Sequence, residues 1–321
     1  MHQSKHKIFI VTEDNETYRQ LLADHALPDL ALTEDIEQAN IILAAPPHIA
    51  PRLSECHQLE WLQSTYAGVN ALMQPELRRD YKLTNVRGIF GPLIAEYVIG
   101  YAIQHYRHFA RYAEQQQQRL WQPHPYSSLE GKTITILGTG SIGNHLALAC
   151  SAMGLHTIGV NRTGIPPNGS HFQQTYHINE LAAALKQTYH INELAAALKQ
   201  AHIVVNTLPS TEHTHHLLNQ ASLSHCRHAL LFNVGRGDVI DNAALLLAIK
   251  NHWVEHAFLD VFEQEPLVTD HPFWGLKQIT ITPHIAALSF PEKVMALFAE
   301  NYHRWLEGYP LNHQVSFTKG Y

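Results

Sequence analysis

Short apolar runs alternate along the chain with longer segments that have helical periodicity. Runs at residues 7–11, 40–45 and 60–64 predict buried strands, and the pattern at residues 16–25 predicts a helix. The first 90 residues therefore predict a small α/β unit. A longer helical pattern begins near Gly91-Pro92, with apolar side chains recurring every three or four positions, and predicts a helix over residues 92–113.

A glycine motif follows the apolar run at residues 133–137. The run leads into Gly138-Thr139-Gly140-Ser141-Ile142-Gly143, then a helical pattern that ends at Gly154, then a strand pattern at residues 156–160. This order and spacing are those of a dinucleotide-binding unit. The first glycine permits the tight turn, the second lets the backbone approach the pyrophosphate, and the third lets the helix pack on the strand. Phosphate oxygens would then meet the free amides at the start of the helix.

Further strand and helix patterns alternate after this motif. They predict strands at residues 203–207, 229–234, 256–261 and 279–282, and helices near 216–223 and at 242–250. Such alternation is typical of a parallel, doubly wound α/β sheet.

An exact repeat interrupts this series. Residues 175–187 read TYHINELAAALKQ, and residues 188–200 repeat them letter for letter. Thirteen helical residues turn by about 1300°, which leaves the second copy rotated by about 220° from the first. One helix therefore cannot bury both apolar stripes on one neighbour. We predict that the second copy supplies the edge strand and its helix, and that the first is an extra lobe; a new interface helix is the alternative.

Length and composition bound the class of protein. A chain of 321 residues has room for about two domains. Its 22 basic and 28 acidic residues give a net charge of −6 with no basic block, so we expect no nucleic-acid partner. No apolar run is long enough to span a membrane or to serve as a signal peptide, so no membrane association is expected.

The cysteines and histidines bear on the cellular compartment and on metal binding. The three cysteines share no metal-binding spacing and suit a reducing compartment, so we expect a cytoplasmic protein: they are Cys56, Cys150 and Cys226. The 25 histidines are scattered. A metal site at the densest group, His213, His215 and His216, is the less favoured alternative, and we expect no metal.

Three polar residues follow three of the predicted strands. Arg236 follows residues 229–234, Glu265 follows residues 256–261, and His284 follows residues 279–282. Ligands of an open α/β sheet bind beyond the carboxyl ends of its strands, so these side chains can meet beside a nicotinamide.

The chemistry of these side chains fits reduction of a 2-oxo acid. An arginine binds a carboxylate and stabilises negative charge on a carbonyl oxygen. A protonated imidazole donates a proton to that oxygen, and an adjacent carboxylate orients the ring and favours its charged form. Each residue also has an alternative structural explanation, as a loop ion pair, a helix-start charge or one of many histidines.

Across nearly its whole length the chain resembles the D-isomer-specific 2-hydroxyacid dehydrogenases. The motifs that carry this resemblance are Tyr66-Ala67-Gly68-Val69-Asn70, the glycine motif, Val234-Gly235-Arg236-Gly237, residues 260–266 and Thr282-Pro283-His284. Arg87-Gly88-Ile89-Phe90-Gly91, Ala95-Glu96-Tyr97 and the terminal Gly320-Tyr321 are similar to the glyoxylate/hydroxypyruvate reductase A branch.

The resemblance implies an architecture and a set of roles. It implies two Rossmann-like domains, a substrate domain of residues 1–100 plus 288–321 and an inserted dinucleotide-binding domain of residues 101–287. Arg236 would bind substrate, His284 would be the acid/base and Glu265 its partner. The backbone of Ala67, Gly68 and Val69 would hold the substrate carboxylate, and Asp260 would hold the nicotinamide carboxamide. Members are usually homodimers built around the helix at 92–113.

Cofactor preference is predicted from the end of the second strand of the dinucleotide unit. An NAD site usually has an acidic residue about 20 residues after the glycines. Here the chain reads Asn161-Arg162-Thr163, which can pair with a 2′-phosphate, so we expect NADPH to be preferred, with NADH possible. The alternative is that Arg162 is simply exposed in a turn. The predicted cofactor-binding residues are Gly138, Gly140, Ser141, Ile142, Gly143, Asn161, Arg162, Thr163, Leu208, Pro209, Val234 and Asp260.

Three functions remain open at this point. The first is an NADPH-dependent reductase of small 2-oxo acids such as glyoxylate or hydroxypyruvate. The second is a dehydrogenase of a bulkier D-2-hydroxy acid, and the third is a non-enzymatic dinucleotide-sensing module. The complete set of Arg236, Glu265 and His284 argues against the third. Glu265 also disfavours a formate dehydrogenase, since that branch has Gln at this position.

Overall fold

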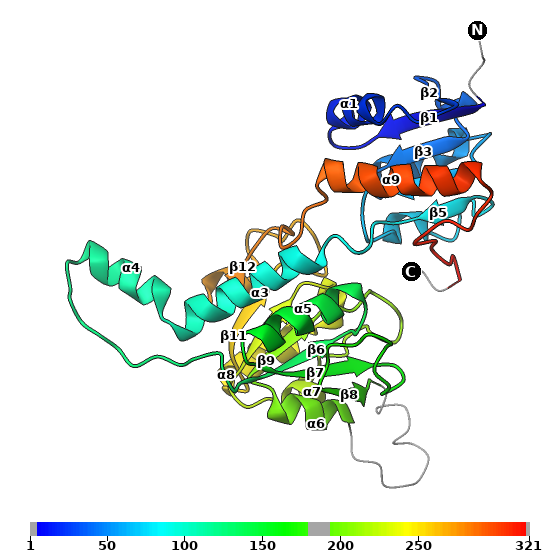
Figure 1. Ribbon diagram of the computed structural model, residues 1–321. Coiled ribbons are helices and arrows are strands. Elements are labelled where there is room, and N and C mark those ends of the chain that lie inside the picture. The colour runs from blue at the N-terminus through cyan, green and yellow to red at the C-terminus, as the bar shows by residue number, and fades with distance from the viewer. Residues whose placement is uncertain (1–4, 179–192, 319–321) are drawn as a thin grey trace, which may run out of the picture. The chain divides into compact units, whose positions relative to one another are not determined.

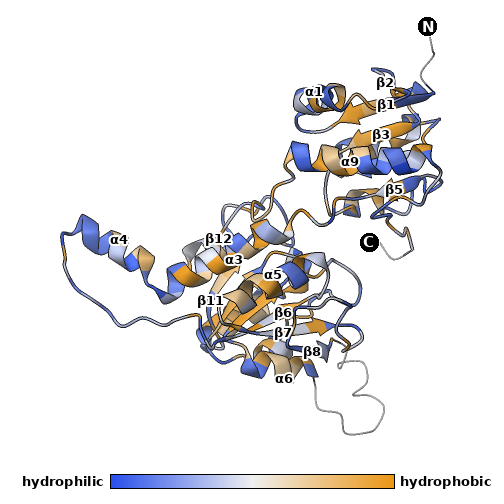
Figure 2. Cartoon of the chain, in the orientation of Figure 1, coloured by the Kyte–Doolittle hydropathy of each residue, from blue (hydrophilic) through white to orange (hydrophobic). Residues whose placement is uncertain are grey.

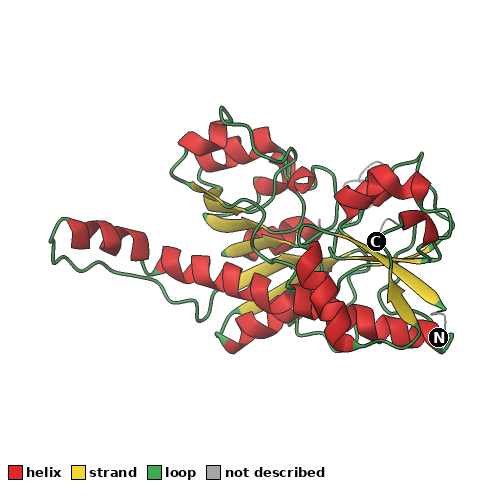
Figure 3. Cartoon of the chain, turned by 90° about the horizontal axis from the view of Figure 1, so that it is seen from above, coloured by secondary structure: helices red, strands yellow, loops and turns green. Residues whose placement is uncertain are grey.

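The computed structural model describes residues 5–178 and 193–318 of the chain. It divides into two compact units, residues 1–89 with 289–321 (unit 1) and residues 90–288 (unit 2). In each, helices flank a sheet of parallel strands, which Figures 1 and 3 show. Among the described helices, none combines the length and the apolar character needed to cross a membrane.

Unit 1 is built on a five-stranded parallel sheet of order β2-β1-β3-β4-β5. The strands are β1 (His6–Val11), β2 (Leu30–Leu32), β3 (Ile41–Ala44), β4 (Trp61–Ser64) and β5 (Lys82–Thr84). Its helices are α1 (Asn15–His25), α2 (Pro46–Ile49) and α9 (Pro291–Leu306), with short 3₁₀ turns at Ile36–Gln38, Ala50–Glu55 and Asn70–Leu72.

The C-terminal helix completes the core of unit 1. The Trp61 ring of β4 stacks on Phe298 of α9 with ring centroids 5.1 Å apart. Tyr302 of α9 is fully buried, and its hydroxyl donates to the Pro28 carbonyl oxygen at 2.7 Å. The end of the chain is therefore part of the first folding unit, as the insertion of one domain into the other requires.

Unit 2 contains a seven-stranded parallel sheet of order β12-β11-β10-β9-β6-β7-β8. The strands are β6 (Thr133–Leu137), β7 (His156–Asn161), β8 (Gln174–His177), β9 (Ile203–Asn206), β10 (Ala229–Asn233), β11 (Val254–Leu259) and β12 (Ile279–Ile281). The helices are α3 (Gly91–Tyr106), α4 (Phe109–Gln117), α5 (Ser141–Ala152), α6 (Glu193–Gln200), α7 (Gln220–Leu223) and α8 (Asn242–Lys250), with 3₁₀ turns at Gly237–Val239 and Pro272–Gly275.

Alternating side chains on these strands explain why helices cover both faces of the sheet. Ile203 and Val205 pack into the cluster that contains α3 and α5, whereas Val204 between them packs with α6 and α8. The central strands are apolar on both sides and appear orange in Figure 2. Continuous apolar runs are typical of strands that are buried on two faces. The predicted fold class is confirmed.

The boundary between the units falls before α3 rather than at residue 100. Ile94, Ala95, Val98 and Ala102 of α3 share a buried cluster with α5. The two helices are so close that a Cβ on Gly91 would lie 2.6 Å from the His145 Cβ. The whole of α3 is therefore a layer of unit 2, which a boundary at 100/101 would have split.

The helix predicted over residues 92–113 is two helices. α3 ends at Tyr106, His108 has a left-handed backbone with φ of 57°, and α4 begins at Phe109. Figure 1 shows α4 extending away from the sheet of unit 2. Periodicity did not reveal this break, because a histidine carries none of the glycine or proline signals that usually mark one.

The two copies of the repeat share one strand and one helix. β8 is formed by Thr175, Tyr176 and His177 of the first copy with Gln174 before them, whereas α6 is formed by the last eight residues of the second copy. The prediction that the second copy supplies both elements was therefore wrong for the strand. Identical sequences satisfy the same contacts, so nothing in the residues themselves favours either copy. The predicted extra lobe lies outside the described residues.

The contacts of these two elements are those of an ordinary edge unit. Among the described strands, β8 pairs with β7 alone, and Ile178, Leu194, Ala197 and Leu198 pack into the core. The Gln200 side chain donates to the Tyr176 hydroxyl at 3.3 Å.

Deletion of thirteen residues from the repeat should leave the fold intact. Removal of either copy produces the same chain, which retains the residue types that now form β8 and α6. We expect this variant to unfold cooperatively, and to be more stable by about 1 kcal/mol or less because a shorter connection has a smaller closure entropy. Thermal unfolding measures both the cooperativity and the stability.

A destabilising substitution in α6 provides the comparison for the deletion variant. Leu194 is 3% exposed, so Leu194→Asp in the full-length chain should lower the melting temperature clearly. Loss of folding in the deletion variant would show that the thirteen residues have a structural role of their own.

Candidate active site

The order of the strands brings the predicted catalytic residues to one edge of the sheet. β10, β11 and β12 are neighbours, and Arg236, Glu265 and His284 lie in the segments that follow their carboxyl ends. The glycine loop follows β6, which is separated from β10 by β9 alone. The chain reverses its winding direction between β6 and β9, and ligands bind at such switch points.

The glycine loop has the geometry of a phosphate-binding turn. Gly138 has a φ of 103°, which side-chain-bearing residues rarely adopt, and its amide donates to the Val160 carbonyl at 2.9 Å. A Cβ on Gly143 would lie 2.0 Å from the Gly138 carbonyl oxygen, so only glycine allows α5 to start this close to β6.

The start of α5 is open to a ligand. Within the described residues, the amides of Ser141, Ile142 and Gly143 donate to no acceptor, and Gly140 has open space where its Cβ would be. Leu208, which follows β9, borders the turn, since its Cδ2 lies 3.4 Å from a Cβ built on Gly138. These residues fit the pyrophosphate of a dinucleotide.

Two buried asparagines hold the loop that carries Arg236. The Asn206 Nδ2 donates to Asn233 Oδ1 at 2.8 Å, and the Asn233 Nδ2 donates to the Arg236 carbonyl at 3.0 Å. The amide of Val234 donates to the Asn206 carbonyl at 3.2 Å. These three hydrogen bonds hold the loop that carries Arg236 at the carboxyl end of β10. The Arg236 guanidinium donates to the Gly235 carbonyl at 2.7 Å.

The Arg236 guanidinium lies in a partly buried, acidic environment. Burial lowers the pKa of Arg236, and the charges of Glu265 and then Asp238 act in the opposite direction. The charges of Arg236 and Glu265 therefore interact.

His284 and Glu265 form a directly bonded pair. The His284 Nδ1 lies 2.8 Å from the Glu265 Oε2, and the other oxygen of that carboxylate accepts the Phe262 amide at 2.9 Å. An ionised carboxylate only accepts hydrogen bonds, so Nδ1 carries a proton. Within the described part of the chain, Nε2 has no partner, and the His284 side chain is 53% exposed. This leaves Nε2 available to a ligand.

A buried carboxylate holds the His284 backbone in position. Asp260 is 2% exposed and accepts the amides of Ile285 and Ala286, each at 2.9 Å. The backbone amide of His284 donates to the Asp260 carbonyl at 2.9 Å, and its φ of 54° is left-handed. Asp260, predicted to hold the nicotinamide carboxamide, therefore also fixes the loop on both sides of His284.

Two hydroxyl groups extend this network into α3. The Thr282 Oγ1 donates to Asp260 Oδ1 at 2.6 Å and lies 2.7 Å from the Tyr97 hydroxyl. Since the single Thr282 hydroxyl proton is donated to Asp260, the Tyr97 hydroxyl is the donor to Thr282. Burial raises the pKa of Tyr97 well above its usual range, so this donor keeps its proton.

The loop after β7 is organised by Asn161. Its Nδ2 donates to Thr139 Oγ1 at 3.0 Å and to the Ile165 carbonyl at 2.8 Å. Its Oδ1 accepts the amides of Thr163 at 3.0 Å and Gly164 at 2.8 Å. Both polar atoms of Asn161 are thus occupied within the loop, which presents the exposed Arg162 and Thr163 side chains at its tip.

The predicted substrate loop lies in unit 1, directly after β4. The Ser64 hydroxyl accepts the Tyr66 amide at 2.9 Å, and the Val86 amide donates to the Tyr66 carbonyl at 3.1 Å. The amides of Ala67, Gly68 and Val69 donate to no acceptor among the described residues. Three successive amides without an acceptor are able to donate hydrogen bonds to an anion such as a carboxylate.

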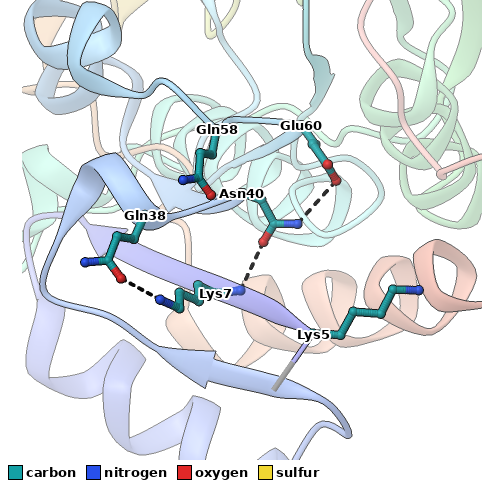
Figure 4. Close-up of a pocket in the computed structure, with 6 residues that line it drawn as sticks. All are labelled: Lys5, Lys7, Gln38, Asn40, Gln58 and Glu60. Carbon is teal, nitrogen blue, oxygen red and sulfur yellow. Dashed lines mark hydrogen bonds between the residues drawn. The ribbon is translucent and has the colours of Figure 1, made fainter. Parts of the chain in front are cut away.

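Figure 4 shows a polar surface hollow elsewhere on unit 1. It is lined by Lys5, Lys7, Gln38, Asn40, Gln58 and Glu60. These residues lie at or before the amino ends of β1, β3 and β4, whereas the substrate loop follows the carboxyl end of β4. Several of their polar groups bond to one another, as with Asn40 Nδ2 and Glu60 Oε2 at 3.2 Å. We therefore assign this hollow no part in the site.

Sequence reasoning missed the residues that support the site. Asn206, Asn233, Thr282 and Tyr97 were given no role, although each is buried or half-buried and hydrogen-bonded to a segment that carries a predicted residue. Polar residues at the ends of otherwise apolar strands were the available signal for the two asparagines. Nothing in the spacing of Tyr97 pointed to Thr282, which lies 185 residues away.

A dinucleotide loop next to a histidine–carboxylate pair and an arginine defines an NAD(P)-dependent oxidoreductase. Comparison with known proteins identifies the group within that class. Residues 99–286, more than half of the chain, match the family described as D-isomer specific 2-hydroxyacid dehydrogenase, NAD binding domain. The chain belongs to this family.

Individual relatives support the same assignment. The chain is 32% identical over 268 residues to a glyoxylate/hydroxypyruvate reductase A from Serratia proteamaculans, covering 80% of this chain and 79% of the relative. A solved structure of a D-isomer specific 2-hydroxyacid dehydrogenase family protein from Aeromonas salmonicida has 42% identity and a TM-score of 0.89, covering 98% of this chain and 100% of that chain. Another from Xanthobacter autotrophicus, in complex with NADPH and MES, has 26% identity and a TM-score of 0.82 over 98% and 99% of the two chains.

Substitution of Thr282 tests the support of the His284 loop. Thr282→Val removes the hydroxyl that bonds Asp260 and Tyr97, so the loop should relax and kcat should fall by about 10- to 100-fold. Tyr97→Phe, which leaves the Thr282–Asp260 bond in place, should have a smaller effect. Steady-state kinetics measures the change in kcat. The melting temperature shows whether the substitution also lowers the stability of the fold.

Thr282→Ser is the matched control because it retains the hydroxyl. It should keep most of the activity that Thr282→Val loses. Unchanged kcat in Thr282→Val would mean that the backbone amides alone position His284.

Proposed function

We propose that the protein is an NADPH-preferring reductase of small 2-oxo acids, such as glyoxylate and hydroxypyruvate, which it converts to D-2-hydroxy acids with His284 as proton donor. The observation that carries this proposal is the His284–Glu265 pair, which holds one ring nitrogen at 2.8 Å from a carboxylate and leaves the other free. The name of the Serratia relative supports the substrate class.

His284 would supply the proton of the reaction. In its doubly protonated form the imidazolium donates from Nδ1 to Glu265 and from Nε2 to the carbonyl oxygen of the substrate. Transfer of the Nε2 proton to that oxygen leaves a neutral ring and a hydroxyl group. Glu265 accepts the Nδ1 hydrogen bond and so orients the ring with Nε2 directed away from the carboxylate.

Arg236 would stabilise charge on the substrate. Its loop follows β10, the strand beside β11, and Glu265 lies in the segment that follows β11. Negative charge develops on the carbonyl oxygen during reduction, and a fixed cation lowers the energy of that state.

The cofactor would be held by residues of unit 2. The amides of residues 141–143 and the turn at Gly138 fit the pyrophosphate, and the loop after β7 would hold the adenosine end. A reduced nicotinamide, when bound, supplies the hydride. Arg162 in place of an acidic residue supports a preference for the 2′-phosphate of NADPH, with Asn161 shaping the loop. The Xanthobacter protein in complex with NADPH is consistent with this choice.

We also propose that two copies of the chain associate through α4 and the segment after it. This region exposes a group of large apolar side chains, with Trp121 99% exposed, Phe109 50%, Leu120 51% and Tyr126 60%. A cluster of this kind marks a surface that another protein covers. The family resemblance implies homodimers built around residues 92–113, and the first residues of α4 fall within that range.

Replacement of His284 by asparagine tests the proton donor. Asparagine tolerates the left-handed backbone of this position better than alanine does, so the loss reports on the imidazole rather than on strain. We expect kcat with glyoxylate to fall by at least about 100-fold while NADPH still binds. The rate of NADPH oxidation gives kcat, and a fluorescence titration gives the Kd for NADPH.

His252→Asn is the matched control, since His252 is exposed and also has a left-handed backbone, with φ of 58°. It should retain wild-type activity. Full activity of His284→Asn would refute the assigned role, and a wild-type chain that turned over no 2-oxo acid would refute the proposed substrate class.

A charge reversal at Arg162 tests cofactor preference. Arg162→Asp places a carboxylate where the 2′-phosphate would bind, so kcat/KM for NADPH should fall by about 10-fold or more, with a much smaller change for NADH. Initial rates with both cofactors give the ratio of kcat/KM for NADPH to kcat/KM for NADH.

Arg227→Asp makes the same charge change at another exposed position of unit 2 and should leave that ratio unaltered. An equal loss with both cofactors in Arg162→Asp would contradict the assignment.

A further inference from the structure

Arg87 is attached to the substrate loop of unit 1 through one buried side chain. Asn85 is 4% exposed, and its Nδ2 donates to the Ala67 carbonyl at 2.7 Å. Its Oδ1 accepts the Arg87 Nε at 3.1 Å. Asn85 therefore fixes the direction of the Ala67 peptide and the position of the Arg87 guanidinium at the same time.

The backbone keeps these two segments side by side. The Val86 amide donates to the Tyr66 carbonyl at 3.1 Å, one residue before Ala67. On the other flank of the segment, the Asn85 amide donates to the His313 carbonyl at 3.2 Å. Residues 85–87 are thus bonded to the loop whose amides at residues 67–69 have no acceptor.

The charge of Arg87 is not neutralised within the described residues. Arg19, Arg52 and Arg78 of the same unit each form an ion pair, with Glu34, Glu55 and Asp80 respectively. In the described ranges, Arg87 has no carboxylate within ion-pair distance, and its terminal nitrogens donate to no acceptor.

Among the described residues, His313 lies within electrostatic reach of Arg87 and adds no negative charge. Burial lowers the pKa of His313, and the charge of Arg87 lowers it further, while Glu300 acts in the opposite direction. The Glu300 carboxylate accepts a hydrogen bond from the Asn312 side chain at 2.6 Å. The local surface therefore combines an unpaired guanidinium with free amides.

We propose that Arg87 binds the carboxylate of the 2-oxo acid together with the amides of residues 67–69, so that unit 1 carries a complete anion site. The inference rests on the proposed function for the identity of the anion. Guanidinium and peptide amides are complementary to a carboxylate, since both donate hydrogen bonds in a fixed direction.

Arg87→Met removes the charge and retains most of the side chain's apolar length. The KM for glyoxylate should rise by about 10- to 100-fold, since a charged hydrogen bond is lost, while kcat changes much less. Arg87→Lys, which keeps the charge but not the planar fork, should recover part of the loss.

An uncharged substrate separates binding of the carboxylate from a merely structural role. With the methyl ester of glyoxylate, Arg87→Met should match the wild-type kcat/KM, because no carboxylate is present. A similar loss with acid and ester would show that Arg87 only supports the loop and would overturn the proposal. Arg52→Met is the control, since Arg52 is paired with Glu55 in the same unit.

Calorimetric binding of oxalate makes the test independent of turnover. Oxalate is a non-reacting carboxylate, and its Kd should be at least about 10-fold weaker for Arg87→Met than for the wild type. An unchanged Kd would overturn the role of Arg87 even if the chain reduces 2-oxo acids. A weakened Kd in a chain that reduces none would retain the anion site and refute only the proposed function.

Discussion

Asp260 lies buried at the carboxyl end of β11, and the segment that follows β12 has to satisfy its negative charge. A buried carboxylate without partners costs several kcal/mol, so the loop is held where it can donate. It does so with the Ile285 and Ala286 amides and the Thr282 hydroxyl. These bonds lie on both sides of His284, whose backbone is left-handed and whose ring bonds Glu265.

The same principle organises the other loops of the site. In each, the side chain of an asparagine donates to a backbone carbonyl, and a longer charged side chain follows within three residues. Asn233 does this for Arg236, Asn161 for Arg162 and Asn85 for Arg87. The charged groups that meet a ligand are therefore presented by neighbours whose side chains are buried or half-buried. Positions of this kind limit how far the charged groups can move when nothing is bound.

Much of this architecture could be predicted from the sequence because it depends on strong, local signals. Apolar runs separated by helical patterns imply parallel strands, and parallel strands bring Arg236, Glu265 and His284 to one edge whatever the details of their loops. The glycine spacing predicted the turn at Gly138 and the approach of α5 to β6, which the structure confirms. The break at His108 and the role of Tyr97 could not be predicted in this way. They depend on one backbone angle and on one contact between distant residues, neither of which changes the pattern of apolar positions.

The division of β8 and α6 between two identical segments has a consequence for the history of the chain. An edge strand pairs on one side only, so a change of length beside it disturbs no further strand. A lineage could gain or lose a copy here in a single genetic step, with the same side chains entering the core before and after. Such a position lets new polypeptide accumulate next to an enzyme's core without passing through an unstable ancestor, and later mutations are then free to make the two copies differ.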